Sequence, residues 1–470
     1  MSMTADTITL LPEAILVAGA VACLLMGSFT PRLKQGRVRL AAAAASLAAA
    51  VPAAIALLDE PTAAFSGTFL ADGLTGLLRL TVCLGLVVLL GLAGEVRAHP
   101  RESEVAVLML FGGAGVMLMG GVQDIAVLLV AFFLASIPLY GLVGLSSDGR
   151  APEAAVKTYL VGALCGILMM LGAAILLGLV GDTAYASLAR LADPDRAPAA
   201  AVGAVALLLI GLLFKAGAVP AHLWVPDATQ GSSVTAAAFL TTLPKLGAVA
   251  ATARLVAALP DQDRWPLLIA VAAAATMTVG NLAALGQSDV RRLLAWSTVS
   301  QAGYLLAAAA AVRAPGADEA LGLGIGTATV ALFLAAYAVT NLGAFAVVAA
   351  LPDKKAVDDW RGTARAHPVL IAALVVCLLG LVGTPPTAIF VAKLAVLSTT
   401  WGAGLAWLAV AVAANTVLSL AYYLRWVGAT LRGTDDSADA RATEIRLAAG
   451  CAAAAVILGL AAGPLLASAG

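Results

Sequence analysis

Leu212-Leu213-Phe214-Lys215-Ala216-Gly217-Ala218-Val219-Pro220 is the stretch that decides the fold, because it interrupts an apolar run from about Ala199 to Trp224. A second apolar run, from about Pro368 to Leu397, is broken at Gly383-Thr384-Pro385-Pro386 and carries Lys393 after the break. A helix rises about 1.5 Å per residue and membrane hydrocarbon is about 30 Å thick, so each run exceeds one span and its break falls at membrane depth. Broken backbone is tolerated there only against protein or a water-filled cavity. Paired breaks in two halves of one chain indicate an ion or substrate path in a transporter with inverted repeats.

The composition is that of a polytopic membrane protein. Of 470 residues, 62% are hydrophobic and 11% are charged, which excludes a globular or disordered chain. The formal net charge is zero, so no basic surplus indicates a nucleic-acid partner. The first ten residues lack a basic segment, and the apolar run that follows is expected to be retained as the first span.

The five cysteines do not form a pattern. They lie singly in apolar runs and far apart, so neither a disulfide framework nor a metal or iron-sulfur site is expected. They are Cys23, Cys83, Cys165, Cys377 and Cys451.

Hydrophobic runs separated by polar, Pro or Gly residues predict an all-α polytopic membrane protein with about fourteen transmembrane helices. The predicted spans are 9–29, 38–58, 73–94, 104–121, 123–145, 155–181, 199–224 (broken), 234–259, 265–286, 291–312, 321–350, 368–397 (broken), 402–430 and 444–468. We expect a single membrane domain in four parts: N-terminal helices 1–3 (1–103), a first inverted repeat of helices 4–8 (104–260), a second of helices 9–13 (261–430), and helix 14 (431–470). The broken helices, 7 and 12, are then the fourth member of each repeat.

Basic residues are concentrated in alternate loops. One set of loops contains Arg32, Lys34, Arg37, Arg39, Arg97, Arg101, Arg150, Lys157, Arg291, Arg292, Lys354, Lys355, Arg361, Arg365, Arg432, Arg441 and Arg446. The other set contains only Arg190, Arg196, Arg264 and Arg313. This bias predicts that the first set is cytoplasmic and that both termini lie outside.

Three lysines lie well inside predicted spans: Lys215, Lys245 and Lys393. A charge at the bilayer centre costs about 2.5–3.5 kcal/mol on insertion scales, so such residues face protein or water and are functional candidates. Burial disfavours the charged form of an amine, which lets it exchange a proton near neutral pH. The alternative is that the amine reaches the membrane surface, which suits Lys157 but not Lys245, because apolar turns flank Lys245 on both sides.

His222 and Asp227 follow the first break closely. His222 could pass protons between Lys215 and the cytoplasmic side, since histidine titrates near physiological pH, and Asp227 could exchange protons with water there. The alternative makes His222 a packing residue and Asp227 a helix cap. The two interpretations remain open on the residues alone.

The stretch from Phe214 to Asp227 resembles the hallmark of the antiporter-like subunits of respiratory complex I. Gln230-Gly231 and Leu243-Pro244-Lys245 are similar to the subunit N family of bacterial NADH-quinone oxidoreductase in particular. Further similar stretches are Leu11-Pro12-Glu13, 157–163, 280–285, 292–297, Gly303-Tyr304, 341–345 and 385–393. The resemblance therefore covers nearly the whole chain.

This resemblance implies a subunit of a translocase that couples quinone reduction, elsewhere in the complex, to proton transfer through buried lysines. By position, Lys215 is the lysine of broken helix 7, Lys245 the relay lysine of helix 8, and Lys393 the lysine of broken helix 12. No cofactor is expected in this chain; quinone, NADH or another donor, FMN and iron-sulfur clusters belong to partner subunits. The implied partners are other membrane and peripheral subunits, lipid and protons, in a bacterial plasma membrane.

Two positions depart from the family pattern. Family members resemble one another in a span 5 glutamate that supplies the counter-charge to the helix 7 lysine, and Phe133 stands at that position. Gln301 stands where the family often has histidine. Two alternatives stay open: a subunit of a multisubunit cation/proton antiporter, which shares the broken-helix lysines, or, because of Phe133, a structural copy of subunit N that does not pump. The sequence does not distinguish protons from sodium.

Overall fold

The computed structural model describes residues 3–92, 101–146, 148–193, 197–260, 264–312, 325–433 and 440–467. Thirteen helices in these ranges are long and apolar enough to cross a membrane, which confirms the prediction of an all-α polytopic protein. One small hairpin interrupts the helices: β1 (Thr62–Ala64) pairs antiparallel with β2 (Phe69–Ala71). Arg97, Arg196 and Arg313, used above for orientation, lie outside the described residues.

The fourteen predicted spans are all present when each broken helix is counted once. They are α2 (Leu11–Phe29), α3 (Gly36–Ala56), α4 (Gly73–Gly91), α5 (Glu102–Gly121), α6 (Ile125–Gly144), α7 (Ala151–Val180), α8 (Pro198–Ala216) with α9 (Trp224–Gly231), α10 (Val234–Ala258), α11 (Arg264–Leu285), α12 (Val290–Ala310), α13 (Ile325–Ala350), α15 (Pro368–Val382) with α16 (Ala388–Gly402), α17 (Ala406–Leu431) and α18 (Ala442–Ala467). Short elements in the connections were not predicted: α1 (Met3–Thr9), η1 (Arg32–Lys34), β1, η2 (Phe65–Gly67), β2, η3 (Tyr185–Ala192), η4 (Val357–Trp360) and α14 (Thr363–Ala366).

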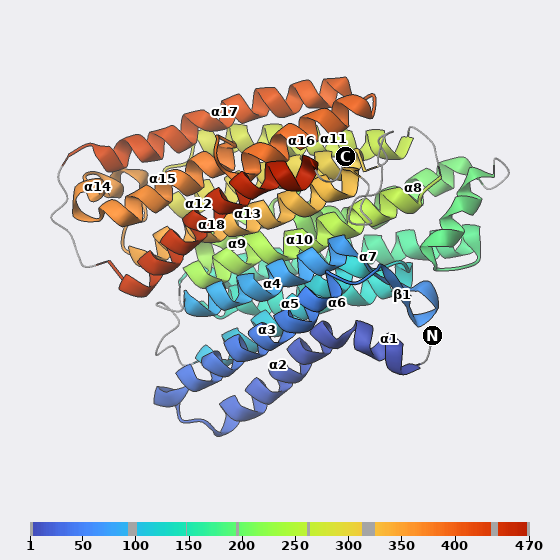
Figure 1. Ribbon diagram of the computed structural model, residues 1–470, viewed down its shortest axis with the longest axis horizontal. Helices are drawn as coiled ribbons and strands as arrows, with labels where there is room; N and C mark the ends of the chain where they lie inside the picture. Colours follow the sequence, from blue (N-terminus) through green and yellow to red (C-terminus); the bar gives the residue numbers. More distant parts are fainter. Residues whose placement is uncertain are drawn as a thin grey trace.

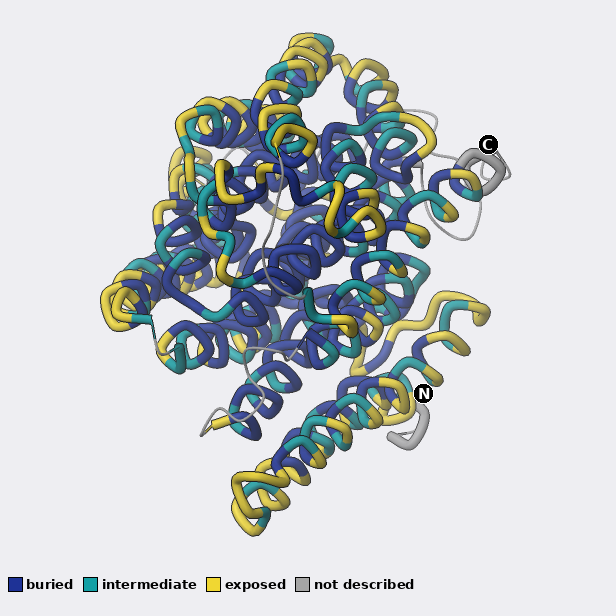
Figure 2. The backbone as a smooth tube through the Cα atoms, turned by 90° about the vertical axis from the view of Figure 1, so that its left-hand side faces the viewer, coloured by how far each residue is buried: buried dark blue, intermediate teal, exposed yellow. Residues whose placement is uncertain are grey.

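The long helices run side by side along the long axis of the molecule (Figure 1). Helix α10 is at the centre, since every residue from Val234 to Val256 is buried. Seen from one end, buried backbone fills the middle of the molecule and exposed backbone forms its rim (Figure 2). The rim exposes large apolar side chains, among them Leu160 of α7 and Val417 of α17, as a bilayer environment requires.

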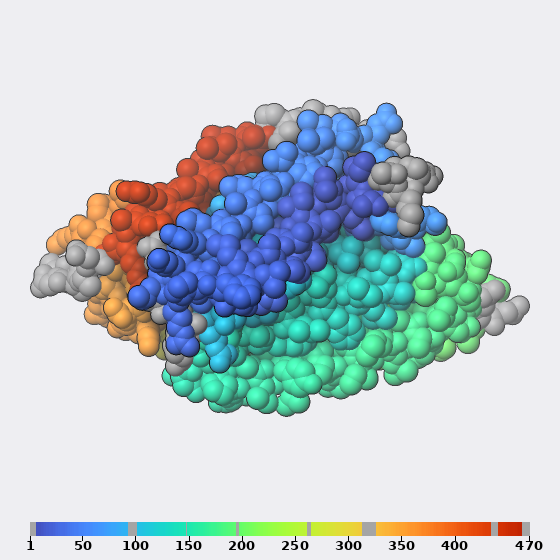
Figure 3. Space-filling view, turned by 90° about the horizontal axis from the view of Figure 1, so that it is seen from below, coloured from blue at the N-terminus to red at the C-terminus, as the bar shows by residue number. Residues whose placement is uncertain are grey.

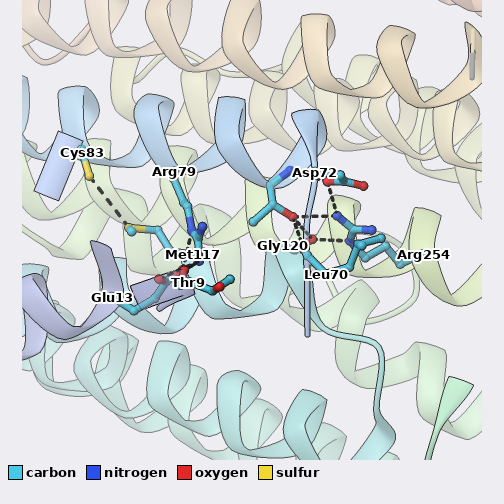
Figure 4. A network of polar contacts seen from close by, with 10 residues as sticks. Thr9, Glu13, Leu70, Asp72, Arg79, Cys83, Met117, Gly120 and Arg254 are labelled. Carbon is cyan, nitrogen blue, oxygen red and sulfur yellow. Dashed lines mark hydrogen bonds and ion pairs between the residues drawn. The ribbon is translucent and has the colours of Figure 1, made fainter. Parts of the chain in front are cut away.

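Buried ion pairs hold α4 between the N-terminal helices and the centre. Arg79 of α4 donates to both carboxylate oxygens of Glu13 on α2, each at 2.8 Å. Arg254 of α10 lies 2.6 Å from the carboxylate of Asp72, which caps α4, and 2.7 Å from the Thr75 hydroxyl. Figure 4 shows both groups between α2, α4 and α10, and Figure 3 shows the N-terminal helices in blue along one side of the molecule. Buried charges are tolerated when paired in this way.

Two equivalent joints occur at the starts of α6 and α12. Asp124 and Asp289 cap these helices through their side chains. Around Asp124, the chain following α7 pairs with residues 123–125, and around Asp289, the chain following α13 pairs with residues 288–290. Five membrane crossings separate the two caps, so the joints lie at opposite ends of the molecule. Inverted repeats of five helices produce this relationship; the boundaries 104–260 and 261–430 remain a prediction.

Helix contacts repeat at the same spacing. An added Cβ on Gly115 of α5 would meet the Ala135 backbone of α6 at 2.5 Å, and one on Gly280 of α11 would meet the Ser300 backbone of α12 at 2.5 Å. Each residue of the second pair follows its counterpart by 165 positions, as Asp289 follows Asp124. Small residues let the backbones of paired transmembrane helices approach this closely.

Candidate functional site

The first break lies between α8 and α9. Helix α8 ends at Gly217, which adopts a left-handed conformation with φ +68°. The backbone N–H of Ala218 donates to the Leu213 carbonyl at 2.8 Å, the hydrogen bond that commonly closes a helix at such a glycine. The chain then runs without regular helix until Trp224, whose indole N–H donates to the Phe214 carbonyl at 3.2 Å.

The second break, between α15 and α16, has the same construction. Gly383 has φ +89°, and the N–H of Thr384 donates to the Leu379 carbonyl at 3.1 Å. Gly383 follows Gly217 by 166 positions, and Leu379 follows its counterpart by the same number. Each half-helix therefore ends inside the protein, where its last carbonyls and the negative end of its dipole need partners from outside the helix.

Lys245 of α10 satisfies the end of α8. Its amine donates to the Ala216 carbonyl at 2.7 Å and to the Thr298 carbonyl of α12 at 3.1 Å. An added Cβ on Gly217 would lie 2.9 Å from this amine, so the glycine leaves the space that the amine needs. Only 1% of the surface of Lys245 is exposed. The alternative that its amine reaches the membrane surface is therefore wrong for this residue.

Lys393 of α16 satisfies the end of α15 in the same way. Its amine donates to the carbonyls of Leu381 and Val382 at 3.1 and 2.9 Å, and it lies 3.9 Å from the ring centre of Tyr304. Gln301 also donates to the Leu381 carbonyl at 2.8 Å. Val382 is the counterpart of Ala216 at the 166-residue spacing. Lys245 and Lys393 thus occupy equivalent electrostatic positions although they come from non-equivalent helices, a relationship that sequence reasoning missed.

Lys215 lies in the last turn of α8 and is fully buried. Its amine donates to the Ser136 hydroxyl of α6 at 2.5 Å and lies 5.0 Å from the ring centre of Phe132. Phe133 is half-buried against Gly166 of α7. The salt bridges formed among the described residues do not include Lys215. Near Lys215, the Ser136 hydroxyl and the Phe132 ring take the place of the glutamate carboxylate that the family pattern implies. Ser136, three residues after Phe133, was the feature of the sequence that could have indicated this partner.

His222 packs against α12, the helix whose Thr298 carbonyl binds Lys245. Its ring lies on Trp296 with 5.6 Å between centres. The Nδ1 atom is buried and has no hydrogen-bond partner in the part of the chain that the structure describes. A buried nitrogen of this kind normally binds water or another polar group.

Asp227 is held by two basic residues. Its carboxylate lies 2.8 Å from Arg292 of α12 and 3.1 Å from Lys157 of α7. It lies in the first turn of α9 but does not cap it, so the interpretation as a helix cap is wrong. Lys157 is half-exposed, as expected for a side chain at a helix end. These residues line a cavity of about 310 Å³ together with Arg150, Glu153, Ala154 and Gln230.

The second unpredicted feature is the connection from this cavity to α12. Gln230 of α9 accepts from Arg292 at 3.1 Å and donates to the second carboxylate oxygen of Asp289 at 3.0 Å. The second half of broken helix 7 is thereby attached to the start of the helix that carries the Thr298 carbonyl and Gln301. Within the described ranges, no group of three or more His, Cys, Asp or Glu side chains is arranged to hold a metal ion.

Comparison with known proteins agrees with this geometry. Residues 122–419 match the family model for the NADH:quinone oxidoreductase/Mrp antiporter transmembrane region. The NADH-quinone oxidoreductase subunit N of Mycobacterium sp. (strain JLS) is 47% identical over 96% of both chains. The chain belongs to the subunit N family. Among solved structures, this antiporter-like fold matches a chain of respiratory complex I from Thermus thermophilus with a TM-score of 0.80 and 29% identity, covering 97% of this chain and 98% of that one. A chain of the Mrp complex from Dietzia sp. DQ12-45-1b shares the fold, with a TM-score of 0.84, 21% identity, and coverage of 100% and 96%.

Proposed function

We propose that this subunit moves protons across a bacterial plasma membrane as part of an NADH-quinone oxidoreductase. It assembles with other membrane and peripheral subunits, which hold the donor site, FMN, iron-sulfur clusters and quinone. The relatives with 47% and 44% identity are subunits N of NADH-quinone oxidoreductases. Both termini lie outside the cell, following the distribution of basic loops.

The observation that supports proton transfer is the pairing of two buried ammonium groups with two half-helix ends. Lys245 and Lys393 are bound by backbone carbonyls, and none of the described carboxylates neutralises them. A carbonyl binds the charged amine, but the amine can lose its proton without leaving an ionised partner behind. The two sites can therefore exist in either protonation state, as a relay requires.

In the proposed path, protons enter from the cytoplasm near Asp227 and His222. They then pass Lys215 and Lys245 and leave toward the outside near Lys393. The cavity lined by Asp227 gives water access to the cytoplasmic end, and the buried Nδ1 of His222 gives a site for a bridging water.

The test replaces Lys245 with alanine in the assembled complex. We expect quinone-coupled proton pumping per electron to fall, because the variant lacks the titratable group between the two breaks. Lys34→Ala, which removes an exposed amine in a loop, serves as the matched control. An unchanged proton-to-electron ratio in Lys245→Ala would exclude the role.

A second candidate is a structural subunit that does not pump, which Phe133 supports because it removes the usual counter-charge. Restoring the carboxylate in Phe133→Glu separates the two. If Lys215 already works with Ser136, the variant gains no pumping and pumping remains sensitive to Lys215→Ala. A clear gain in pumping would instead indicate that the native chain had lost the function.

The cation/proton antiporter alternative has less support. The Mrp likeness is below 25% identity and concerns the fold alone, whereas the 47% identical relative is a quinone oxidoreductase subunit. Sodium- or potassium-dependent proton flux in vesicles that lack quinone reductase activity would favour the antiporter.

A further inference from the structure

A cavity unrelated to the lysines lies at the end of the molecule where α11 meets α12 and where α17 ends. It has a volume of about 320 Å³. Its lining contains three arginines: Arg425 and Arg432 of α17, and Arg361, which follows η4. The loops at this end belong to the set that the basic residues assign to the cytoplasm.

The three guanidinium groups leave a net positive charge in the cavity. Arg361 is paired with Asp358 at 2.8 Å. Arg425 donates to the carbonyls of Leu285 and Gln287 at the end of α11, and carbonyls orient its guanidinium without cancelling its charge. Arg432, the C-cap of α17, is exposed. Arginine presents a planar set of donors that suits phosphate oxygens.

An exposed apolar stripe on α17 leads to these arginines. It consists of Val410, Val417, Leu424 and Leu431, which are 62%, 67%, 48% and 63% exposed. A spacing of seven residues places side chains nearly in line along a helix, and the 21 steps from Val410 to Leu431 rise about 32 Å, close to the thickness of membrane hydrocarbon. Leu424 and Leu431 each precede an arginine of the cavity by one residue. In Figure 1, α17 lies along the upper edge of the molecule.

We propose that this cavity binds the phosphate headgroup of an anionic phospholipid whose acyl chains lie along the exposed stripe of α17. Basic pockets between transmembrane helices at the cytoplasmic surface bind acidic headgroups. The adjacent stripe distinguishes a lipid from free phosphate, since a free anion gains nothing from apolar side chains. By neutralising Arg425 and Arg432, the headgroup would hold the ends of α11 and α17 together.

The experiment measures lipid binding and is independent of proton transfer. The assembled complex is delipidated in mild detergent and titrated with phosphatidylglycerol or phosphatidylcholine in nanodiscs, with thermal stability and retained lipid as readouts. We expect phosphatidylglycerol to bind and stabilise, phosphatidylcholine to do neither, and Arg432→Gln to weaken phosphatidylglycerol binding about fivefold. Arg37→Gln is the matched control, because it also removes one positive charge, from an exposed arginine at the start of α3.

Arg432→Gln is the main variant because, among the described residues, Arg432 makes no carbonyl contacts like those of Arg425, whose loss in Arg425→Gln could disturb folding. Equal phosphatidylglycerol binding by Arg432→Gln and Arg37→Gln would overturn the assignment. Stabilisation by inorganic phosphate alone, matching that by phosphatidylglycerol, would also overturn it, because the site would then bind a free anion rather than a lipid.

Discussion

Replacing Gly217 with alanine should damage the protein through two separable effects. The first is backbone strain: at φ +68° an L-residue costs about 1–2 kcal/mol more than glycine. The second is crowding, because the new Cβ would lie 2.9 Å from the Lys245 amine and 2.7 Å from Val225. Displacing the amine from the Ala216 carbonyl forfeits a charged hydrogen bond of about 1.5–3 kcal/mol. The expected total is about 2.5–5 kcal/mol.

Gly404→Ala is the matched control for this variant. Gly404 also has a positive φ, +76°, but an added Cβ there meets no atom of the described residues within 4 Å. It should therefore show the strain of about 1–2 kcal/mol without the crowding. The assays are resistance of the assembled complex to heat in detergent, and protons pumped per electron at matched rates of quinone reduction.

We expect Gly217→Ala to be less stable than Gly404→Ala and to lose pumping, while Gly404→Ala keeps it. Gly383→Ala should resemble Gly217→Ala, because its Cβ would lie 2.9 Å from the Lys393 side chain. Equal stability and equal pumping in Gly217→Ala and Gly404→Ala would refute the reasoning that the glycine exists to admit the lysine amine.

Two further variants test the polar contacts that support the site and the fold. Ser136→Ala should lower pumping, because it removes the hydroxyl that accepts a hydrogen bond from Lys215. Ser46→Ala is the control and should leave pumping unchanged, since it removes another buried hydroxyl that donates to a carbonyl one turn earlier. Equal pumping in the two variants would contradict the role of Ser136 as the partner of Lys215. Asp72→Asn should destabilise the complex to heat by about 3–5 kcal/mol, because Arg254 is left as an unpaired buried charge. A loss no larger than the ~0–1 kcal/mol typical of an exposed pair would show that the pair is not buried in the assembly.

Much of the fold was predictable because its signals are local. A span is an apolar run of fixed length, and all fourteen runs became helices, most of them within a few residues of their predicted limits. The exception is the first broken span, which was predicted to end at Trp224, where its second half, α9, begins. Each break depends on a glycine that can adopt a positive φ, followed closely by proline, and both breaks appear where the sequence placed them. The short elements of the connections, such as η3, were missed because they lack an apolar period of sufficient length.

The contacts of the site depended on packing. The sequence by itself determined that Lys215, Lys245 and Lys393 would be buried, since a lysine flanked by apolar turns has no route to the membrane surface. It did not determine which atoms their amines bind, because Lys245 meets carbonyls 29 and 53 residues away, and Lys215 a hydroxyl 79 residues away. Those partners are brought together by the angles and offsets at which whole helices pack. These geometric quantities arise from many weak contacts distributed over the chain, and no short stretch encodes them.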